Sequence, residues 1–291
     1  MLIGVELDDA RVIAVAVTED GVVHARAQAA VEVGIEAAAR AALKQLQPSG
    51  EVEHIGFASS IPNDDATAAV VAIQQPLTVT TASIASGTAA AVAESWIGAA
   101  QGAGHVALFS VGDRTSGGFV RGGQPILGAR GRAGAVGWMS LNPVEREDYR
   151  KIGCLEAEVA ASGIVRRLIW RIKAGDRSEV QDAVDNELST ITMAHVLDAA
   201  RKGDGVSISV IRDTAKYLGM AAANIAALAD PEVLVLGGLM ASAADLLLEP
   251  VRLEINRRLP RAMLDGLSIV AATLGDDAAA IGAARIATTH P

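Results

Sequence analysis

The chain has 291 residues and a formal net charge of −9 at pH 7, with 51% hydrophobic and 20% charged residues. This length supports one large or two medium domains with a sizeable core, and the composition excludes a disordered chain. The acidic balance argues against a broad nucleic-acid-binding face, so we expect no nucleic-acid partner.

Cys154 is the single cysteine, which excludes an internal disulfide and a cysteine-rich metal site. The first residues lack the basic and apolar regions of a signal peptide. The longest apolar run, at 217–229, contains Asn224 and stops at Asp230-Pro231, so it is too short to span a bilayer. We therefore expect a cytoplasmic protein with no membrane partner.

The N-terminal part predicts three strands followed by alternating helices and strands. Alternating β-branched segments at 2–7 and 11–17 are joined by the turn Asp8-Asp9-Ala10. The further elements are a strand at 22–30, a helix at 33–47, a strand at 54–59, a helix at 64–73, a strand at 77–80 and a helix at 86–97. Ser83 or Ser86 is available to cap the last helix.

Gly102 and Gly104 mark a boundary, after which the pattern starts again. Strands are predicted at 105–111, 116–121 and 124–127. Helices are predicted at 155–160, 164–174, 179–186, 192–201, 205–228, 244–258 and 278–287, and strands at 232–236 and 267–271. Two copies of a strand meander followed by helices indicate an internally duplicated α/β architecture.

A glycine-rich segment, G-A-R-G-R-A-G-A-V-G-W at 128–138, lies in the middle of the chain. Its glycines recur at every third position, which is too dense for a helix. Glycine suits backbone positions that need a positive φ or a close approach to a ligand. Two interpretations remain open: a surface loop with many turns, or a loop that cradles a ligand between two lobes.

Four stretches resemble motifs of the ROK family (repressors, open reading frames and kinases). They are the segment 128–138, similar to G-A-x-G-x-A-G-E-I-G-H; Gly153-Cys154-Leu155-Glu156, similar to the end of a zinc motif; the helix-strand-Gly-Gly segment 220–238; and L-G-D-D-A-A-A-I-G-A-A at 274–284. The resemblance spans essentially the whole chain. It implies an actin-like ATPase (ribonuclease H-like) fold in its duplicated, two-domain sugar-kinase form.

We divide this α/β fold into an N-terminal domain at 1–104 and a helix-rich domain at 105–277, with the terminal helix 278–288 packing back on the first. The family's activity is ATP-dependent phosphorylation of a sugar hydroxyl, so ATP and Mg²⁺ are the cofactors that an active member implies. Its members commonly dimerise, and the resemblance therefore implies a homo-oligomer.

The resemblance places the nucleotide phosphates at two turns. Glu6-Leu7-Asp8-Asp9-Ala10 stands where the family has D-x-G-G-T, and residues 112–118, with an aspartate at 113, stand for G-T-G-x-G-G-G. Aspartates at these places would repel a triphosphate. Arg114 could offset them by pairing with Asp8 or Asp9, although both segments also fit ordinary charged hairpin tips.

The candidate nucleotide-binding residues at the implied site are Gly112, Gly117, Gly237 and Gly238. Gly237-Gly238 retains the form of the family's adenosine segment. It would admit an adenine-like ring, or serve only for tight packing between strand and helix.

The family's base, an aspartate, aligns with Ser86, and a serine cannot accept a proton at neutral pH as a carboxylate does. Ser86 is therefore either a substrate contact or a plain helix cap. Of the implied sugar contacts, Glu156 is kept, although a glutamate there would also favour the helix dipole without any ligand. Gly134 is kept in the glycine-rich loop. Trp138 stands at a zinc-ligand position and would stack on a ligand ring or fill the vacated volume.

Zinc is not expected. The other positions of the zinc motif carry Glu147, Tyr149 and Cys154, and one thiolate without a histidine does not make a tetrahedral site. We expect Cys154 to be a buried small residue.

Three hypotheses for function follow. The first is a pseudokinase that has lost sugar phosphorylation and binds a sugar-like small molecule or a partner protein. The second is an active hexose or N-acetylhexosamine kinase with an atypical base, for which Asp8, Asp9, Asp64, Asp65 and Asp113 are candidates. The third is a sugar-responsive repressor, which in this family carries a DNA-binding module ahead of the first meander. The first predicted strand starts at Leu2, so we expect no such module.

Overall fold

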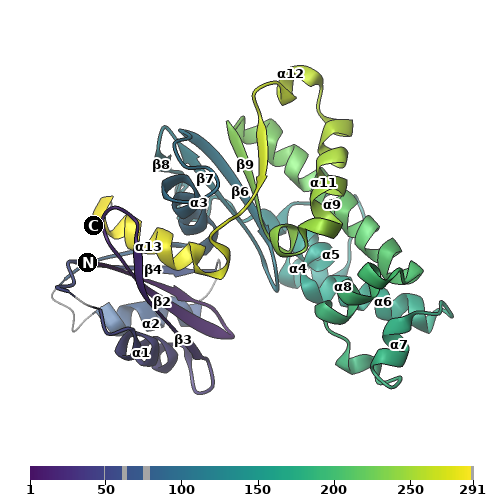
Figure 1. Cartoon of the computed structure of the whole chain (residues 1–291), viewed down its shortest axis with the longest axis horizontal. Helices are drawn as coiled ribbons and strands as arrows, with labels where there is room; N and C mark the ends of the chain where they lie inside the picture. Colours follow the sequence, from purple (N-terminus) through teal and green to yellow (C-terminus); the bar gives the residue numbers. More distant parts are fainter. Residues whose placement is uncertain (49, 61–63, 75–78, 290–291) are drawn as a thin grey trace.

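The computed structural model describes the chain except for residues 49, 61–63, 75–78 and 290–291. Its strands form two five-stranded sheets, with helices between and around them (Figure 1). The strands are β1 (Leu2–Leu7), β2 (Arg11–Val17), β3 (Val23–Ala30), β4 (His54–Ser59), β5 (Thr80–Ala85), β6 (His105–Val111), β7 (Thr115–Arg121), β8 (Gln124–Pro125), β9 (Val233–Gly238) and β10 (Ser268–Ala271).

Both sheets have the same topology. The first has the order β3-β2-β1-β4-β5, in which β1 is antiparallel to β2 and parallel to β4. The second has the order β10-β9-β6-β7-β8, in which β6 is antiparallel to β7 and parallel to β9. The two orders match strand for strand, which confirms the predicted duplication.

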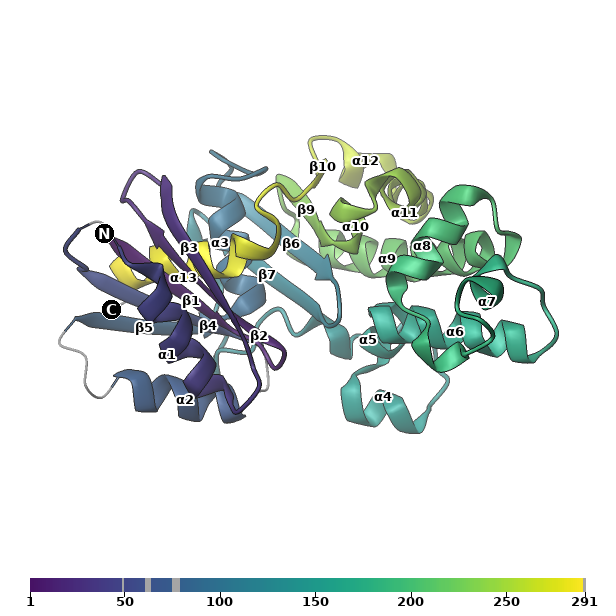
Figure 2. The same ribbon diagram turned by 60° about the horizontal axis from the view of Figure 1, so that its bottom comes forward.

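The first sheet is covered on both faces, and the alternation along β1 shows why. Ile3, Val5 and Leu7 pack with α1 (Ile35–Leu46) and α2 (Asp64–Gln74). Leu2 packs on the opposite face with α13 (Ala278–Thr289). Successive side chains of a strand point to opposite faces, so one apolar strand supplies two cores. Figure 2 shows α1 and α2 on one side of these strands and α13 on the other.

Helices α13 and α3 (Ser86–Trp96) pack against each other between the two sheets, where α3 contacts β6 and β7. Their contact is backbone to backbone. A Cβ on Gly282 would lie 1.7 Å from the Ala89 carbonyl oxygen, and one on Gly4 of β1 would lie 1.8 Å from the Ala280 carbonyl oxygen. Only glycine allows this approach. The terminal helix therefore packs against β1 of the first sheet.

The second sheet is covered by a helical cluster. Its central helix is α9 (Gly205–Ala229), whose first turn is capped because Asp204 accepts a hydrogen bond from the Ser207 N–H at 2.8 Å. The other helices are α4 (Glu147–Ile152), α5 (Cys154–Val159), α6 (Ala161–Lys173), α7 (Glu179–Ala183), α8 (Met193–Lys202), α10 (Leu239–Ser242), α11 (Ala244–Arg258) and α12 (Arg261–Leu264). Phe109 and Leu236 of the sheet are buried in this core.

Most predicted elements are found within a few residues of their expected bounds, and two predictions are wrong. The strand expected at 77–80 is β5 (Thr80–Ala85), while residues 77 and 78 lie outside the described residues. Its small side chains lack the apolar pattern of a strand, and pairing with β4 supplies the stabilisation instead. Neither Ser83 nor Ser86 caps α3, because its N-cap residue is Ala85 and no side chain caps it.

The division after residue 104 leaves one sheet on each side, and we retain it as a proposal.

Within the described part of the chain, none of the helices combines the length and apolar character that crossing a membrane requires.

We predict that Gly282→Ala lowers the free energy of unfolding by about 2 kcal/mol or more, because the new methyl group would overlap the Ala89 carbonyl. The helix propensity of alanine acts in the opposite direction by about 1 kcal/mol. Urea unfolding at equilibrium measures the net change. Gly205→Ala is the matched control, since a Cβ there meets nothing within 4 Å. Equal stability of the two variants would contradict the packing account.

Candidate ligand-binding cleft

A cleft of about 810 Å³ opens where the carboxyl ends of β1, β6 and β9 meet the start of α3. Ligands commonly bind at the carboxyl ends of strands in α/β folds. All eight residues singled out from the sequence line this cleft: Ser86, Gly112, Gly117, Gly134, Trp138, Glu156, Gly237 and Gly238. Of the five candidate aspartates, Asp8 and Asp113 line it, and the exposed Asp65 lies on α2 outside its lining.

The glycine-rich loop has two parts. Residues 128–132 are exposed, as a surface loop would be, whereas Gly134, Ala135 and Trp138 line the cleft. Gly134 has a φ of +86°, and a Cβ there would lie 2.1 Å from the Gly117 carbonyl oxygen. Gly134 and Gly117 thus hold the loop against β7.

The Gly237-Gly238 turn also packs closely against its neighbouring strand. Gly238 has a φ of +61°, and a Cβ there would lie 2.1 Å from the Val111 carbonyl oxygen of β6. The packing role of this turn is therefore evident. A ligand contact remains a proposal.

Glu156 is held in place by the β6–β7 turn. Its Oε2 accepts hydrogen bonds from the backbone N–H and the hydroxyl of Thr115, both at 2.9 Å. It also lies in the first turn of α5, where a negative charge favours the helix dipole. The side chain has a structural function here, with its carboxylate at the wall of the cleft.

Trp138 is 46% exposed at the cleft wall. About half of the indole is packed and half is accessible, so the exposure is compatible with both interpretations of Trp138. An exposed indole beside a cleft offers a flat surface on which a ligand ring can stack.

Ser86 is the first residue of α3 and is buried, with 9% of its surface exposed. Its hydroxyl makes no hydrogen bond of good geometry with the described residues, although it lies close enough to the Glu6 carboxyl to act on that group's pKa. A buried hydroxyl that is bonded so weakly can still form a hydrogen bond with a ligand or water. The side chain lies beside the Glu6 carboxyl at the floor of the cleft.

Glu6 is the functional candidate that sequence analysis missed. It lies on β1, lines the cleft and is only slightly exposed there. Burial raises the pKa of the Glu6 carboxyl to about 7, while the Ser86 hydroxyl opposes part of that rise and the Asp8 charge adds to it. A carboxyl with such a pKa can give or take a proton at neutral pH. The available signal was one charged residue within an otherwise apolar strand.

The two turns expected at the phosphates are joined by an ion pair. Arg114 of the β6–β7 turn donates to Asp9 of the β1–β2 turn, which confirms the prediction that Arg114 pairs with Asp8 or Asp9. Asp8 accepts a hydrogen bond from the Ala10 N–H at 3.1 Å. The pair connects the two sheets across the cleft, and its side chains are about half exposed.

The zinc-motif positions do not form a metal site. Tyr149 is buried and donates its hydroxyl to Glu158, and Trp138 carries no ligand atom for zinc. Cys154 is a free thiol that is half-buried, not fully buried as expected. In the described portion of the chain, no three His, Cys, Asp or Glu side chains are grouped to hold a metal ion.

Comparison with known proteins gives the family. A model of the ROK family matches residues 20–290. The chain belongs to the ROK family. A glucokinase from Halalkalibacterium halodurans is 36% identical over 197 residues, which are 66% of this chain and 59% of that glucokinase. An N-acetylglucosamine repressor from Escherichia coli is 30% identical over 194 residues, 66% of this chain and 46% of the repressor.

The match therefore spans about half to three fifths of the length of these two ROK relatives. A ROK glucokinase from Streptomyces griseus, solved with glucose and AMPPNP, is 25% identical and superposes with a TM-score of 0.80 over 99% of both chains. The chain is thus homologous to ROK sugar kinases and has their two-domain, actin-like ATPase fold.

We predict that Glu6→Gln flattens the pH dependence of stability between pH 4.5 and about 7. The folded protein holds the Glu6 proton more tightly than the unfolded chain does. Proton binding by Glu6 therefore stabilises the wild type in full below the pKa that Glu6 has in the unfolded chain. This stabilisation is lost as the pH rises through the pKa of Glu6 in the folded protein. A pKa that rises from 4.5 to about 7 on folding corresponds to a loss on the order of 3 kcal/mol. Urea unfolding at several pH values measures it. An unchanged pH profile in the variant would show that Glu6 titrates alike in both states.

Proposed function

We propose that this ROK protein binds a sugar-like small molecule in the cleft without transferring a phosphate group to it. The observation that carries the proposal is the charge at the two turns that face the nucleotide phosphates in the family's pattern. Asp8 and Asp113 line the cleft there, and Asp9 and Arg114 are paired across it.

A triphosphate would bring more negative charge to these turns. Two like charges about 4 Å apart repel by about 4 kcal/mol near a protein surface. Arg114 is already engaged by Asp9, so its charge offsets the protein's own carboxylate. Mg²⁺ would reduce the repulsion, but the loops retain few of the glycines whose backbone amides hold phosphates in the family's pattern.

The cleft residues at the positions that contact the sugar in the family's pattern support a binding role. Trp138 offers an exposed aromatic face, Glu156 a positioned carboxylate and Ser86 a buried hydroxyl beside the Glu6 carboxyl. Sugars are bound by hydrogen bonds to their hydroxyls together with stacking of their apolar faces. The Streptomyces griseus relative was solved with glucose, which supports a hexose-like ligand.

A second candidate function is an active sugar kinase in which Glu6 replaces the missing aspartate. One observation favours it: the Glu6 carboxyl lies beside Ser86, the position of the family's base, and its pKa of about 7 suits a general base. In this alternative, Glu6 would take the proton of the attacking sugar hydroxyl while ATP supplies the phosphoryl group.

We predict no sugar-dependent ADP release from Mg-ATP with a panel of hexoses and N-acetylhexosamines, and a change in Trp138 fluorescence with the sugars that bind. The carboxylate base is replaced by serine, and the aspartates oppose the nucleotide. Ser86→Ala should leave the background ADP release unchanged, and Trp138→Phe should remove the fluorescence change. Asp8→Asn keeps the turn geometry and should strengthen AMPPNP binding about tenfold by removing one negative charge. Turnover well above background would overturn the pseudokinase proposal.

If turnover is found, the second candidate predicts that Glu6→Gln lowers kcat by roughly 10² to 10⁴. The wild-type rate should rise with pH around 7, because the carboxylate form of Glu6 is the base. This rising limb should be absent in Glu6→Gln. Glu53→Gln is the matched control, since that carboxyl lies outside the cleft lining and pairs with the chain's N-terminus. A Glu6→Gln enzyme with wild-type kcat would assign the base elsewhere.

A further inference from the structure

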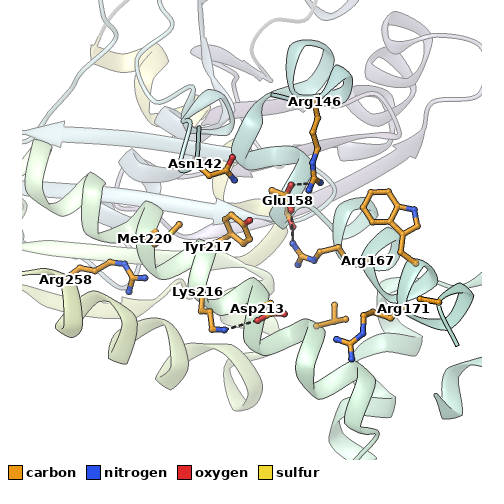
Figure 3. A pocket seen from close by; sticks show the side chains of 13 residues that line it. Asn142, Arg146, Glu158, Arg167, Arg171, Asp213, Lys216, Tyr217, Met220 and Arg258 are labelled. Carbon is orange, nitrogen blue, oxygen red and sulfur yellow. Dashed lines mark hydrogen bonds and ion pairs between the residues drawn. The ribbon is translucent and has the colours of Figure 1, made fainter. Parts of the chain in front are cut away.

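A second pocket, of about 640 Å³, lies in the helical cluster (Figure 3). It is formed mainly by α6 and α9, with contributions from α5, the segment before α4 and the end of α11. None of the residues that line it lines the cleft. The family motifs that support ligand binding in the cleft therefore do not involve this pocket.

The pocket wall carries more cationic than acidic side chains. Five of its side chains are cationic and two are carboxylates: Arg146, Arg167, Arg171, Lys216 and Arg258 against Glu158 and Asp213. The whole chain has a net charge of −9, so this concentration of positive charge does not follow from composition. Arg171 and Arg258 also pair with Asp176 and Glu254, which lie outside the lining. The wall therefore keeps a small excess of positive charge, which an anion in the cavity would offset.

Glu158 fixes the inner wall. Its buried carboxylate pairs with Arg146 at 3.1 Å and with Arg167 at 3.2 Å, as the dashed lines in Figure 3 mark. Tyr149 also donates its hydroxyl to it. These contacts occupy both carboxylate oxygens. Glu158 therefore positions two guanidinium groups and is not available to a bound cation.

Burial lowers the pKa of the Arg167 guanidinium, and the Glu158 charge opposes that effect. A bound anion would act as Glu158 does and favour the protonated, positively charged form of Arg167. Arg167 also donates to the carbonyl oxygen of Glu158 at 2.6 Å and to the Thr214 hydroxyl. It is thus held rigidly at the inner wall.

The rim retains unused donors. Lys216 pairs with Asp213 at 3.0 Å, and Arg258 uses one nitrogen on Glu254. Arg146 donates through a single nitrogen to Glu158. An arginine has five N–H donors and a lysine three. Several of these therefore have no partner among the described residues.

The remaining lining is aromatic and apolar. Trp170 is 50% exposed, and the Tyr217 ring lies 5.9 Å from the Arg167 guanidinium carbon. Val210 and Met220 of α9 complete this part of the wall. Such a surface would bury the apolar body of a ligand whose charged group meets the rim.

We propose that this pocket binds a small organic anion, whose carboxylate or phosphate group pairs with Arg146, Lys216 and Arg258 and whose apolar part packs against Trp170 and Tyr217. A neutral sugar does not meet these requirements, because it brings no charge to the basic wall. The ligand class therefore differs from that proposed for the cleft, and the two sites are separate.

Isothermal titration calorimetry of the full chain with phenyl phosphate, benzoate and benzyl alcohol tests the proposal. We expect at least one of the two anions to bind with a millimolar Kd, and neutral benzyl alcohol at least about tenfold more weakly. Comparing phenyl phosphate with benzoate identifies the preferred anionic group. Anion binding should weaken as salt is raised, because the rim cations are partly exposed. Trp170 fluorescence should respond to the anion, and this response should disappear in Trp170→Phe.

Lys216→Gln should weaken anion binding by about tenfold, since one charge-assisted hydrogen bond is lost. Arg261→Gln removes the same charge from a side chain that is 94% exposed, outside the pocket, and should bind as the wild type does. Thermal unfolding checks that both variants are folded. Equal binding of benzyl alcohol, wild-type affinity in Lys216→Gln, or no binding of either anion would overturn the proposal. In the last case, a stable dimer in size-exclusion chromatography would assign the pocket to an interface between copies.

Discussion

The contact on which the structure depends is the backbone-to-backbone packing of α3 and α13 between the two sheets. Gly282 meets Ala89, Gly4 meets Ala280 and Gly87 meets Gly117, each at a distance that leaves no room for a Cβ. At these three points no side chain separates the elements, and the surrounding core consists of Ala, Val, Ile and Leu, in keeping with an aromatic content of 3%. Such packing fixes the start of α3, and with it Ser86, relative to the strand ends around the cleft.

The cleft combines this rigid scaffold with chemistry that differs from the family's pattern. Glu156 is kept but is bound by Thr115, and Ser86 stands where the pattern has an acidic base. Glu6, which lies beside Ser86 on β1, has the raised pKa that the base position itself no longer supplies. Burial acts on Glu6 mainly through its location on the central strand of the first sheet, so the fold itself sets the protonation of this group.

Much of the fold could be predicted from the sequence, because β-branched alternation and helical periodicity are strong in the buried elements. β5 was misplaced because Thr80, Ala82 and Ser83 carry no such pattern, and its identity as a strand depends on pairing with β4. The short helices α4, α10 and α12 were missed, because four to six residues show only a weak periodicity. The equally short α5 and α7 were predicted, but only as part of helical patterns with other bounds.

For the candidate site, the glycine motifs indicated residues that line a single cleft, because glycines with positive φ or close contacts leave a recognisable spacing. They did not indicate Glu6, whose importance comes from burial and from the neighbouring Ser86. The aromatic wall at Trp138 could be noticed but not interpreted, since a half-exposed indole is compatible with both packing and ligand contact. The basic pocket left no local signal, because its cations come from helices far apart in the sequence.

The short helix α5 separates the two pockets. Glu156 lies on its cleft side, and Glu158, two residues further along, lies on the side of the basic pocket. Successive helical residues are turned by about 100°, so these two carboxylates point in nearly opposite directions. Each is held by its own partners, Thr115 on one side and two arginines on the other. A movement of this short helix would therefore change both pockets. If a ligand in one pocket shifts the helix and so changes the affinity of the other pocket, thermodynamic linkage requires that the second ligand change the affinity of the first by the same factor.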